Sequence, residues 1–218
     1  MNSPHSRYRI RYYNLFSRVY DRFVAAHSGD REGRLRAALA DRSMLESGNR
    51  VLDLCTGTGA MLPWLNWGVA GRGLVIGLDF SRGMLTQARR KTRDDPAVVL
   101  VEADAERLPF RAGSIDVITC SHALYELKGA GADRALEEVV RVLTPGGRFL
   151  MMEHEVPERL AVRLLFYVRL LSMGLRKALE VLGHEEEFFR RHFAGVERAN
   201  TETGRSKIII GLGSARPG

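Results

Sequence analysis

The stretch VLDLCTGTG (Val51–Gly59) decides how this chain folds. Its first residues belong to an apolar run, Arg50–Leu54, and its last residues form a turn that contains Gly57 and Gly59. A buried strand that ends in a glycine-rich turn before a helix is typical of the first unit of a parallel α/β sheet. Because glycine lacks a Cβ atom, such a turn can lie close to a ligand. The stretch therefore predicts a strand, a binding turn and a helix from about Ala60.

The same alternation of short apolar runs and helical patterns continues along the chain. Helices are expected at Arg82–Thr92, where Ser81 can cap the first turn, and at Ala132–Leu143. A turn is expected at Pro145–Gly147, and a long amphipathic helix over Glu158–Leu182. The expected strands are Arg50–Leu54, Gly73–Leu78, Val98–Glu102, Ser114–Cys120, Arg148–Glu153, Val196–Thr201 and Ser206–Leu212. This plan predicts an α/β protein built on a parallel sheet.

The composition is that of an ordinary globular protein. Of its 218 residues, 45% are hydrophobic and 27% are charged, and this length suits one α/β domain better than two. We therefore predict a single domain over residues 1–218. Within it, 1–48 forms a helical cover, 49–156 the cofactor-binding core, and 157–218 the late helix and the last two strands.

The charge and the cysteines limit the classes of partner. A formal net charge of +7 favours anionic partners, but the basic residues are not gathered into one tract and no aromatic series interleaves them. We therefore expect no nucleic acid as partner. Cys55 and Cys120 lack partners at metal-ligand spacing, so neither a disulfide framework nor a metal site is expected, and the cytoplasm is the expected location. No stretch reaches the 18 apolar residues of a membrane span, so any membrane contact would be peripheral, at the inner face.

Three acids follow the apolar runs in the order that an adenosyl ligand requires. Asp53 comes at the end of the first run, Asp79 after the second and Asp104 after the third. An acid after the second strand can accept hydrogen bonds from both ribose hydroxyls, and a polar group after the third can contact the adenine edge. In open α/β sheets such groups converge beyond the carboxyl ends of the strands. The ordered set therefore indicates an adenosyl-binding site more specifically than the glycine turn alone.

On these residues the chain resembles the class I S-adenosylmethionine-dependent methyltransferases. It is similar in particular to the ubiquinone and menaquinone biosynthesis C-methyltransferases (methyltransferase type 11). The matching segments are VLDLCTGTG (51–59), VIGLDFSRGML (75–85), EADAERLPF (102–110), SIDVITCSHALYEL (114–127) and EVVRVLTPGGRFLMMEH (138–154), with a fainter match at YNLFSRVYD (13–21). The resemblance implies a Rossmann-like, seven-stranded, mostly parallel sheet with helices on both faces and an antiparallel edge strand.

The resemblance also implies roles for the first two strand ends. Gly57 and Gly59 would flank the methionine portion of S-adenosylmethionine, and Asp53 would organise this loop and its contacts with the amino group. Asp79 would hold the ribose, with Phe80 against the adenine. The family often has glycine two residues after the first acid, where this chain has a cysteine, and small residues other than glycine occur there in the quinone-methylating group.

Further roles follow for the later strands and the N-terminal segment. Asp104 and Ala105 would contact the adenine amino group, and Ser121 and His122 would lie beside the methionine and sulfonium. Tyr20, and with it Tyr13, would belong to an N-terminal helix that covers the site.

The acceptor-side chemistry is less determined by the sequence. Methyl transfer is an in-line displacement at carbon, so the protein must align the acceptor and, where needed, remove a proton. His122 and His154 are the candidate bases because histidine titrates near neutral pH, although either could be a structural histidine. The other acid–base candidates after the fourth and fifth strands are Tyr125, Glu126, Glu153 and Glu155.

We expect a small, apolar or lipid-like acceptor, either a quinone precursor or a phospholipid amine, dissolved in a membrane, and S-adenosylhomocysteine as the product. The apolar face of Glu158–Leu182 could line its cleft, and basic residues could rest against anionic head groups. Two alternatives stay open. One is a catalytically silent module that binds the adenosyl cofactor. The other is a nicotinamide-dependent oxidoreductase, although Leu62 stands where the dinucleotide motif has a third small residue. The sequence leaves open the acceptor atom and the oligomeric state.

Overall fold

The structure is a computed structural model, and it describes residues 10–15, 17, 33–92, 95–123, 130–154, 184–201 and 206–214. Some predictions lie outside these residues. They concern Tyr20, Tyr125, Glu126 and Glu155, the helix expected at Glu158–Leu182, and the side chain of His154.

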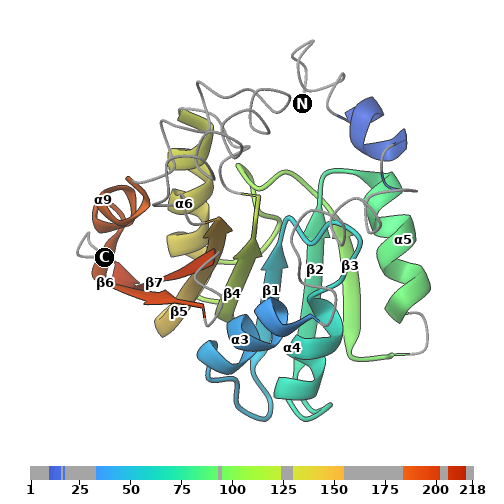
Figure 1. Ribbon diagram of the computed structural model, residues 1–218, viewed down its shortest axis with the longest axis horizontal. Coiled ribbons are helices and arrows are strands. Elements are labelled where there is room, and N and C mark those ends of the chain that lie inside the picture. The colour runs from blue at the N-terminus through green and yellow to red at the C-terminus, as the bar shows by residue number, and fades with distance from the viewer. Residues whose placement is uncertain are drawn as a thin grey trace, which may run out of the picture.

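The described strands form one seven-stranded sheet in the order β3-β2-β1-β4-β5-β7-β6 (Figure 1). The pairs β3–β2, β2–β1, β1–β4 and β4–β5 are parallel, while β7 pairs antiparallel with both β5 and β6. The strands are β1 (Arg50–Leu54), β2 (Leu74–Asp79), β3 (Val98–Glu102), β4 (Ile115–Ser121), β5 (Leu143–His154), β6 (Phe193–Asn200) and β7 (Ser206–Ser214). The predicted Rossmann-like sheet is therefore confirmed, and its edge strand β6 is antiparallel to the reversed strand β7.

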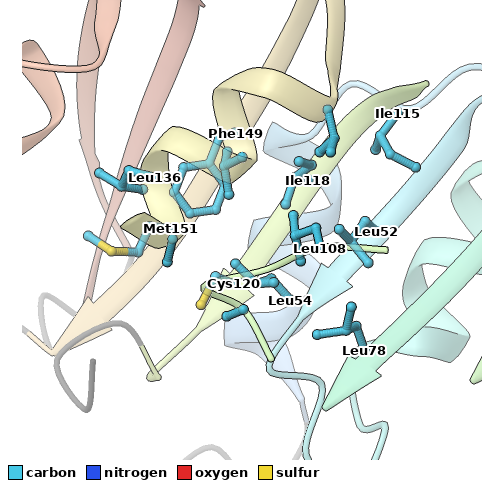
Figure 2. Close-up of a cluster of buried hydrophobic side chains, with 14 of the residues drawn as sticks. Leu52, Leu54, Leu78, Leu108, Ile115, Ile118, Cys120, Leu136, Phe149 and Met151 are labelled. Carbon is cyan, nitrogen blue, oxygen red and sulfur yellow. The ribbon is translucent and has the colours of Figure 1, made fainter. Parts of the chain in front are cut away.

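Helices cover both faces of this sheet. The described helices are α3 (Arg34–Arg42), α4 (Leu62–Gly68), α5 (Arg82–Thr92), α6 (Ala130–Val142) and α9 (Glu185–Arg190). Strand side chains alternate between the two faces, so Leu52 and Leu54 of β1 enter one core while Val51 enters the other. The first core includes residues of α6 and α9, and the second includes residues of α3, α4 and α5. Figure 2 shows part of the first core, where Leu54, Cys120 and Met151 of three neighbouring strands lie together.

Several boundaries differ from the sequence prediction, and the largest differences are at the starts of β5 and β6, with β6 beginning at Phe193 rather than at Val196. Strand β5 begins at Leu143 rather than at Arg148, because Leu143 pairs with Ile115 before the register shifts and Arg148 pairs with Val117. The Pro-Gly-Gly turn thus lies within an irregular part of the β4–β5 ladder. The short helix α9 was not predicted, since six residues that include three glutamates carry no clear apolar period.

Candidate functional site

Asp53, near the end of β1, is a buried carboxyl group held by two threonines. The residue is 1% exposed. The Thr56 hydroxyl donates to Oδ2 at 2.7 Å, and the Thr119 hydroxyl of β4 donates to Oδ1 at 2.8 Å. Burial raises the pKa of Asp53 to about 6, against the lowering effect of both hydroxyls and of the positive charge of Arg36. The carboxyl group is thus fixed in place and has an affinity for a positive charge.

The turn after β1 has a left-handed backbone at several positions. Gly57 has φ 56° and Gly59 has φ 73°, while Cys55 adopts φ 56° without being glycine. The cysteine therefore stands at a position whose backbone favours glycine. The Cys55 thiol and burial both raise the pKa of Cys120, which agrees with packing roles for the two cysteines rather than a nucleophilic one.

Asp79, the last residue of β2, joins this turn to the start of α5. Its side chain is 5% exposed, Oδ2 accepts the Gly57 N–H at 2.9 Å, and Oδ1 accepts the Ser81 N–H at 2.9 Å. The Ser81 hydroxyl accepts the Met84 N–H at 3.2 Å, which confirms the predicted cap of the helix. The two backbone N–H groups fix the Asp79 carboxylate at the carboxyl end of β2.

Phe80, the residue after Asp79, contacts the N-terminal segment. The Tyr13 and Phe80 rings meet edge to face, with centroids 5.6 Å apart. Residues 10–15 form a helical turn beside the upper end of α5, drawn in blue in Figure 1. A part of the predicted N-terminal cover therefore reaches the loop that carries Asp79.

After β3, Asp104 closes a tight turn in which its Oδ1 accepts the Glu106 N–H at 3.1 Å. Ala105 is 5% exposed, and its side chain packs in the core, so only its main chain can contribute to a ligand site. Both residues follow the strand next to β2, as predicted.

Ser121 and His122 lie at the carboxyl end of β4, and both are half-buried. His122 has φ 54°, and its backbone N–H donates to the Met152 carbonyl of β5 at 2.8 Å. A positive φ is uncommon for a residue other than glycine, although histidine adopts it more often than most, and such residues cluster at functional sites. Glu153 and His154 end β5, where Glu153 is fully buried.

Two hydrogen bonds bring Asp53 and Asp79 to the same turn. Thr56 donates to Asp53, and Gly57, the next residue, donates to Asp79 at the end of β2. Asp104, Ser121 and His122 lie at the ends of flanking strands along the same edge of the sheet, which is the upper edge in Figure 1.

Sequence reasoning missed four residues, namely Thr56, Thr119, Asn14 and Arg36. Thr119 could have been found from the strand pattern, because it is a polar residue between the apolar Ile118 and Cys120. Asn14 carries no such signal, since its contacts lie 67 and 69 residues away along the chain.

The arrangement suits a small ligand that has a cationic group and a diol. Buried Asp53 can attract an ammonium group, and the Asp79 carboxylate can accept hydroxyl hydrogen bonds. Within the described residues, no group of three or more metal-ligating side chains is found. None of the helices that the structure describes has the length and apolar character needed to cross a membrane.

Comparisons with known proteins agree with this geometry. Residues 51–147 match a family model described as a methyltransferase domain. The demethylmenaquinone methyltransferase of Staphylococcus saprophyticus is 35% identical over 138 residues, which cover 63% of this chain and 58% of that protein. The demethylmenaquinone methyltransferase of Oceanobacillus iheyensis is 31% identical over 172 residues, covering 77% of this chain and 71% of the relative. The match therefore leaves out a substantial part of each relative's length.

Among solved structures, a similar fold occurs in a chain from the complex between the Haloferax volcanii Trm112 methyltransferase activator and a methyltransferase partner. The TM-score is 0.71 at 22% identity, and the superposition covers 93% of this chain and 97% of that chain. At 22% sequence identity, this similarity concerns the fold alone.

Proposed function

The chain belongs to the class I S-adenosylmethionine-dependent methyltransferases, in the group of the demethylmenaquinone methyltransferases, and we propose that it transfers a methyl group from S-adenosylmethionine to a small apolar acceptor. The observation that carries this proposal is the Asp79 carboxylate, which is fixed by the Gly57 and Ser81 N–H groups at the end of β2.

The residues of the site fit the parts of this cofactor. Asp79 would accept the two ribose hydroxyls, Asp53 would attract the ammonium group, and Phe80 would contact the adenine. Gly57 and Gly59 would allow the methionine portion to lie against the turn. Bound S-adenosylmethionine would supply an electrophilic methyl group on a sulfonium, so the protein has mainly to exclude water and align the acceptor.

The remaining predicted contacts belong to the same proposal. Asp104 and the Ala105 main chain would contact the adenine edge, and Ser121 and His122 would lie beside the methionine. Of the two candidate histidine bases, His122 is the one whose side chain lies in the described part of the chain, directly after β4. His154 remains a second candidate base, supported only by the position of its backbone at the end of β5.

Binding of the cofactor is tested by calorimetric titration with S-adenosylhomocysteine, S-adenosylmethionine and NADH. We expect both adenosyl ligands to bind and NADH not to bind. Asp79→Ala should weaken S-adenosylhomocysteine binding roughly 10- to 150-fold, the range for lost hydrogen bonds to a charged group. Asp41→Ala, which removes an exposed carboxylate from the end of α3, is the matched control and should leave the affinity unchanged. Binding of NADH alone would overturn the proposal in favour of an oxidoreductase.

For the acceptor, the names of the relatives support a quinone precursor, and a phospholipid amine is the competing lipid-like acceptor. The test uses labelled S-adenosylmethionine and anionic vesicles that carry either a demethylated quinol or phosphatidylethanolamine. We expect label only in the quinol vesicles. Label only in phosphatidylethanolamine would transfer the proposal to a lipid amine. If the cofactor binds but label appears neither in these vesicles nor in water-soluble acceptors, the silent binding module is favoured.

A further inference from the structure

Asn14, on the helical turn 10–15, binds the first residues of α5 with one oxygen atom. Its Oδ1 accepts the Ser81 hydroxyl at 2.8 Å and the Gly83 N–H at 2.8 Å. These partners lie 67 and 69 residues further along the chain. The N-terminal segment therefore satisfies a backbone donor of the first turn of α5 that the helix itself cannot satisfy.

Ser81 transmits this contact to the ribose-binding acid. Because its hydroxyl hydrogen points to Asn14, its oxygen is free to accept the Met84 N–H at 3.2 Å. The Ser81 backbone N–H in turn donates to Asp79 Oδ1 at 2.9 Å. One residue thus connects the N-terminal segment with the carboxylate proposed to hold the ribose.

The fit between the two segments leaves no room for a larger residue at Gly83. A Cβ atom there would lie 2.6 Å from the Asn14 Cα atom and 2.8 Å from its carbonyl oxygen. On the other side of the loop, Tyr13 contacts the Phe80 ring edge to face. Residues 13 and 14 therefore hold the loop that runs from Phe80 to Gly83 at both ends.

We propose that Asn14 is a positioning residue of the cofactor site, which holds the Asp79–Gly83 loop in the conformation that binds the ribose. This rests on the proposed function, since the loop is assigned to S-adenosylmethionine. Because coupling between two sites is reciprocal, cofactor binding also stabilises the docking of residues 10–15 on α5. Asn14 thereby supports the binding site without touching the reacting atoms.

The geometry provides a set of discriminating variants. Asn14→Ala removes the shared acceptor, whereas Asn14→Asp keeps an oxygen in the same place and adds a negative charge, which is favourable near a helix N-terminus. Gly83→Ala leaves Asn14 intact but forces the two segments apart. Leu15→Ala is the control, because Leu15 is the next residue and is 74% exposed.

The experiment measures S-adenosylhomocysteine affinity by calorimetry and amide hydrogen exchange by mass spectrometry on the full chain. Asn14→Ala and Gly83→Ala should each raise the Kd about tenfold, while Asn14→Asp and Leu15→Ala should stay within about threefold of the parent. In the parent protein the ligand should slow exchange in residues 10–15 and in the first turn of α5. In Asn14→Ala the protection of residues 10–15 should be lost.

The outcomes separate this inference from the proposed function. If the parent protein does not bind S-adenosylhomocysteine, the proposed function fails. If the parent binds and Asn14→Ala binds equally well, Asn14 is structural only, even when the Tm of that variant falls. If Asn14→Ala does not fold, the folded Asn14→Asp variant decides. This variant keeps the shared oxygen, so the proposal predicts an affinity close to that of the parent. A tenfold loss of affinity would show that the oxygen does not position the loop.

Discussion

Asp53 is a carboxyl group whose charge is governed by its surroundings. Burial favours its neutral form, whereas the hydroxyls of Thr56 and Thr119 and the charge of Arg36 favour the ionised form. The resulting pKa of about 6 lies close to physiological pH. A ligand with an ammonium group would shift this balance further toward the carboxylate.

The protein without ligand should become less stable as pH rises through the titration of Asp53. The folded pKa of about 6 lies above the ordinary value of 3.8, so the native state binds the proton more tightly than the unfolded state. The associated stability is complete below pH 4 and is lost as pH rises through about 6, and it amounts to about 3 kcal/mol at 1.4 kcal/mol per pKa unit. Urea unfolding of Asp53→Asn and the parent at several pH values should show this difference. Parallel stability curves for the two proteins would contradict it.

Ligand affinity should change in the opposite direction over the same pH range. If the ammonium group of S-adenosylhomocysteine binds near Asp53, it requires the carboxylate, so the Kd should rise by up to about tenfold for each pH unit below about 6. Asp53→Asn should bind weakly and lose this dependence. Calorimetric titrations at pH 5, 6 and 7 make the comparison. An affinity in the parent protein that does not change with pH would mean that Asp53 only organises the turn.

At the scale of elements, helix α5 supports the turn after β1 by direct contact. A Cβ atom on Gly59 would lie 2.8 Å from the Cβ of Ala88 and 3.1 Å from its Cα. The Lys91 ammonium donates to the Thr58 hydroxyl at 3.1 Å. The turn therefore lies between its own strand and the helix that follows the next strand.

Gly59→Ala should destabilise the protein for two separable reasons. The added methyl group clashes with Ala88, and alanine is strained at φ 73°. We expect a loss of about 2–4 kcal/mol in the free energy of unfolding, combining overpacking with the left-handed penalty. Ala88→Gly in the same chain should relieve the clash with the Ala88 Cβ but neither the strain nor the 3.1 Å approaches to the Ala88 Cα and the Leu62 Cδ1, and so recover only part of the loss. Full recovery in the double variant would show that the backbone conformation contributes nothing.

The sequence predicted the elements that carry their own signal. Strands Arg50–Leu54 and Val98–Glu102 and helix Arg82–Thr92 have the predicted bounds, because apolar runs, turn residues and the Ser81 cap are local features. Asp53, Gly57 and Asp79 likewise lie at the strand ends that the sequence indicates, while their contacts with a cofactor stay a prediction.

The missed features depend on contacts between distant residues. The start of β5 at Leu143 depends on pairing with Ile115, and no local pattern contains that information. Arg36 affects Asp53 only because α3 packs on the face of the sheet to which Asp53 points. Asn14 is an ordinary polar residue until the fold brings it to α5.

At the scale of the whole molecule, the sheet has two parts with different tasks. The parallel strands β3, β2, β1 and β4 end at the proposed cofactor site, whereas β7 and β6 extend the sheet beyond β5 (Figure 1). Helix α9 contacts these two strands. A buried ion pair connects helix α9 to the reversed strand β7. The Lys207 ammonium lies 2.9 Å from each carboxylate oxygen of Glu185, and the two side chains are only 2% and 3% exposed.

Breaking this pair should reduce stability and leave cofactor binding unchanged. Lys207→Met leaves a carboxylate buried without its cation, so we expect a loss of about 3–5 kcal/mol in the free energy of unfolding. Glu185→Gln keeps an acceptor for the ammonium and should cost less. The control is Glu187→Gln, which removes an exposed pair with Arg191 from the same helix and should have almost no effect.

The affinity for S-adenosylhomocysteine decides whether the two parts are independent. Urea unfolding gives the stability of each variant, and calorimetry gives its Kd at a temperature where it is folded. Because the pair lies beyond β5 while the Asp53 and Asp79 groups lie on β1 and β2, the Kd should stay within about threefold of the parent, the expectation for sites without shared partners. A Kd that rises in proportion to the lost stability would show instead that the edge strands and the cofactor site form one cooperative unit.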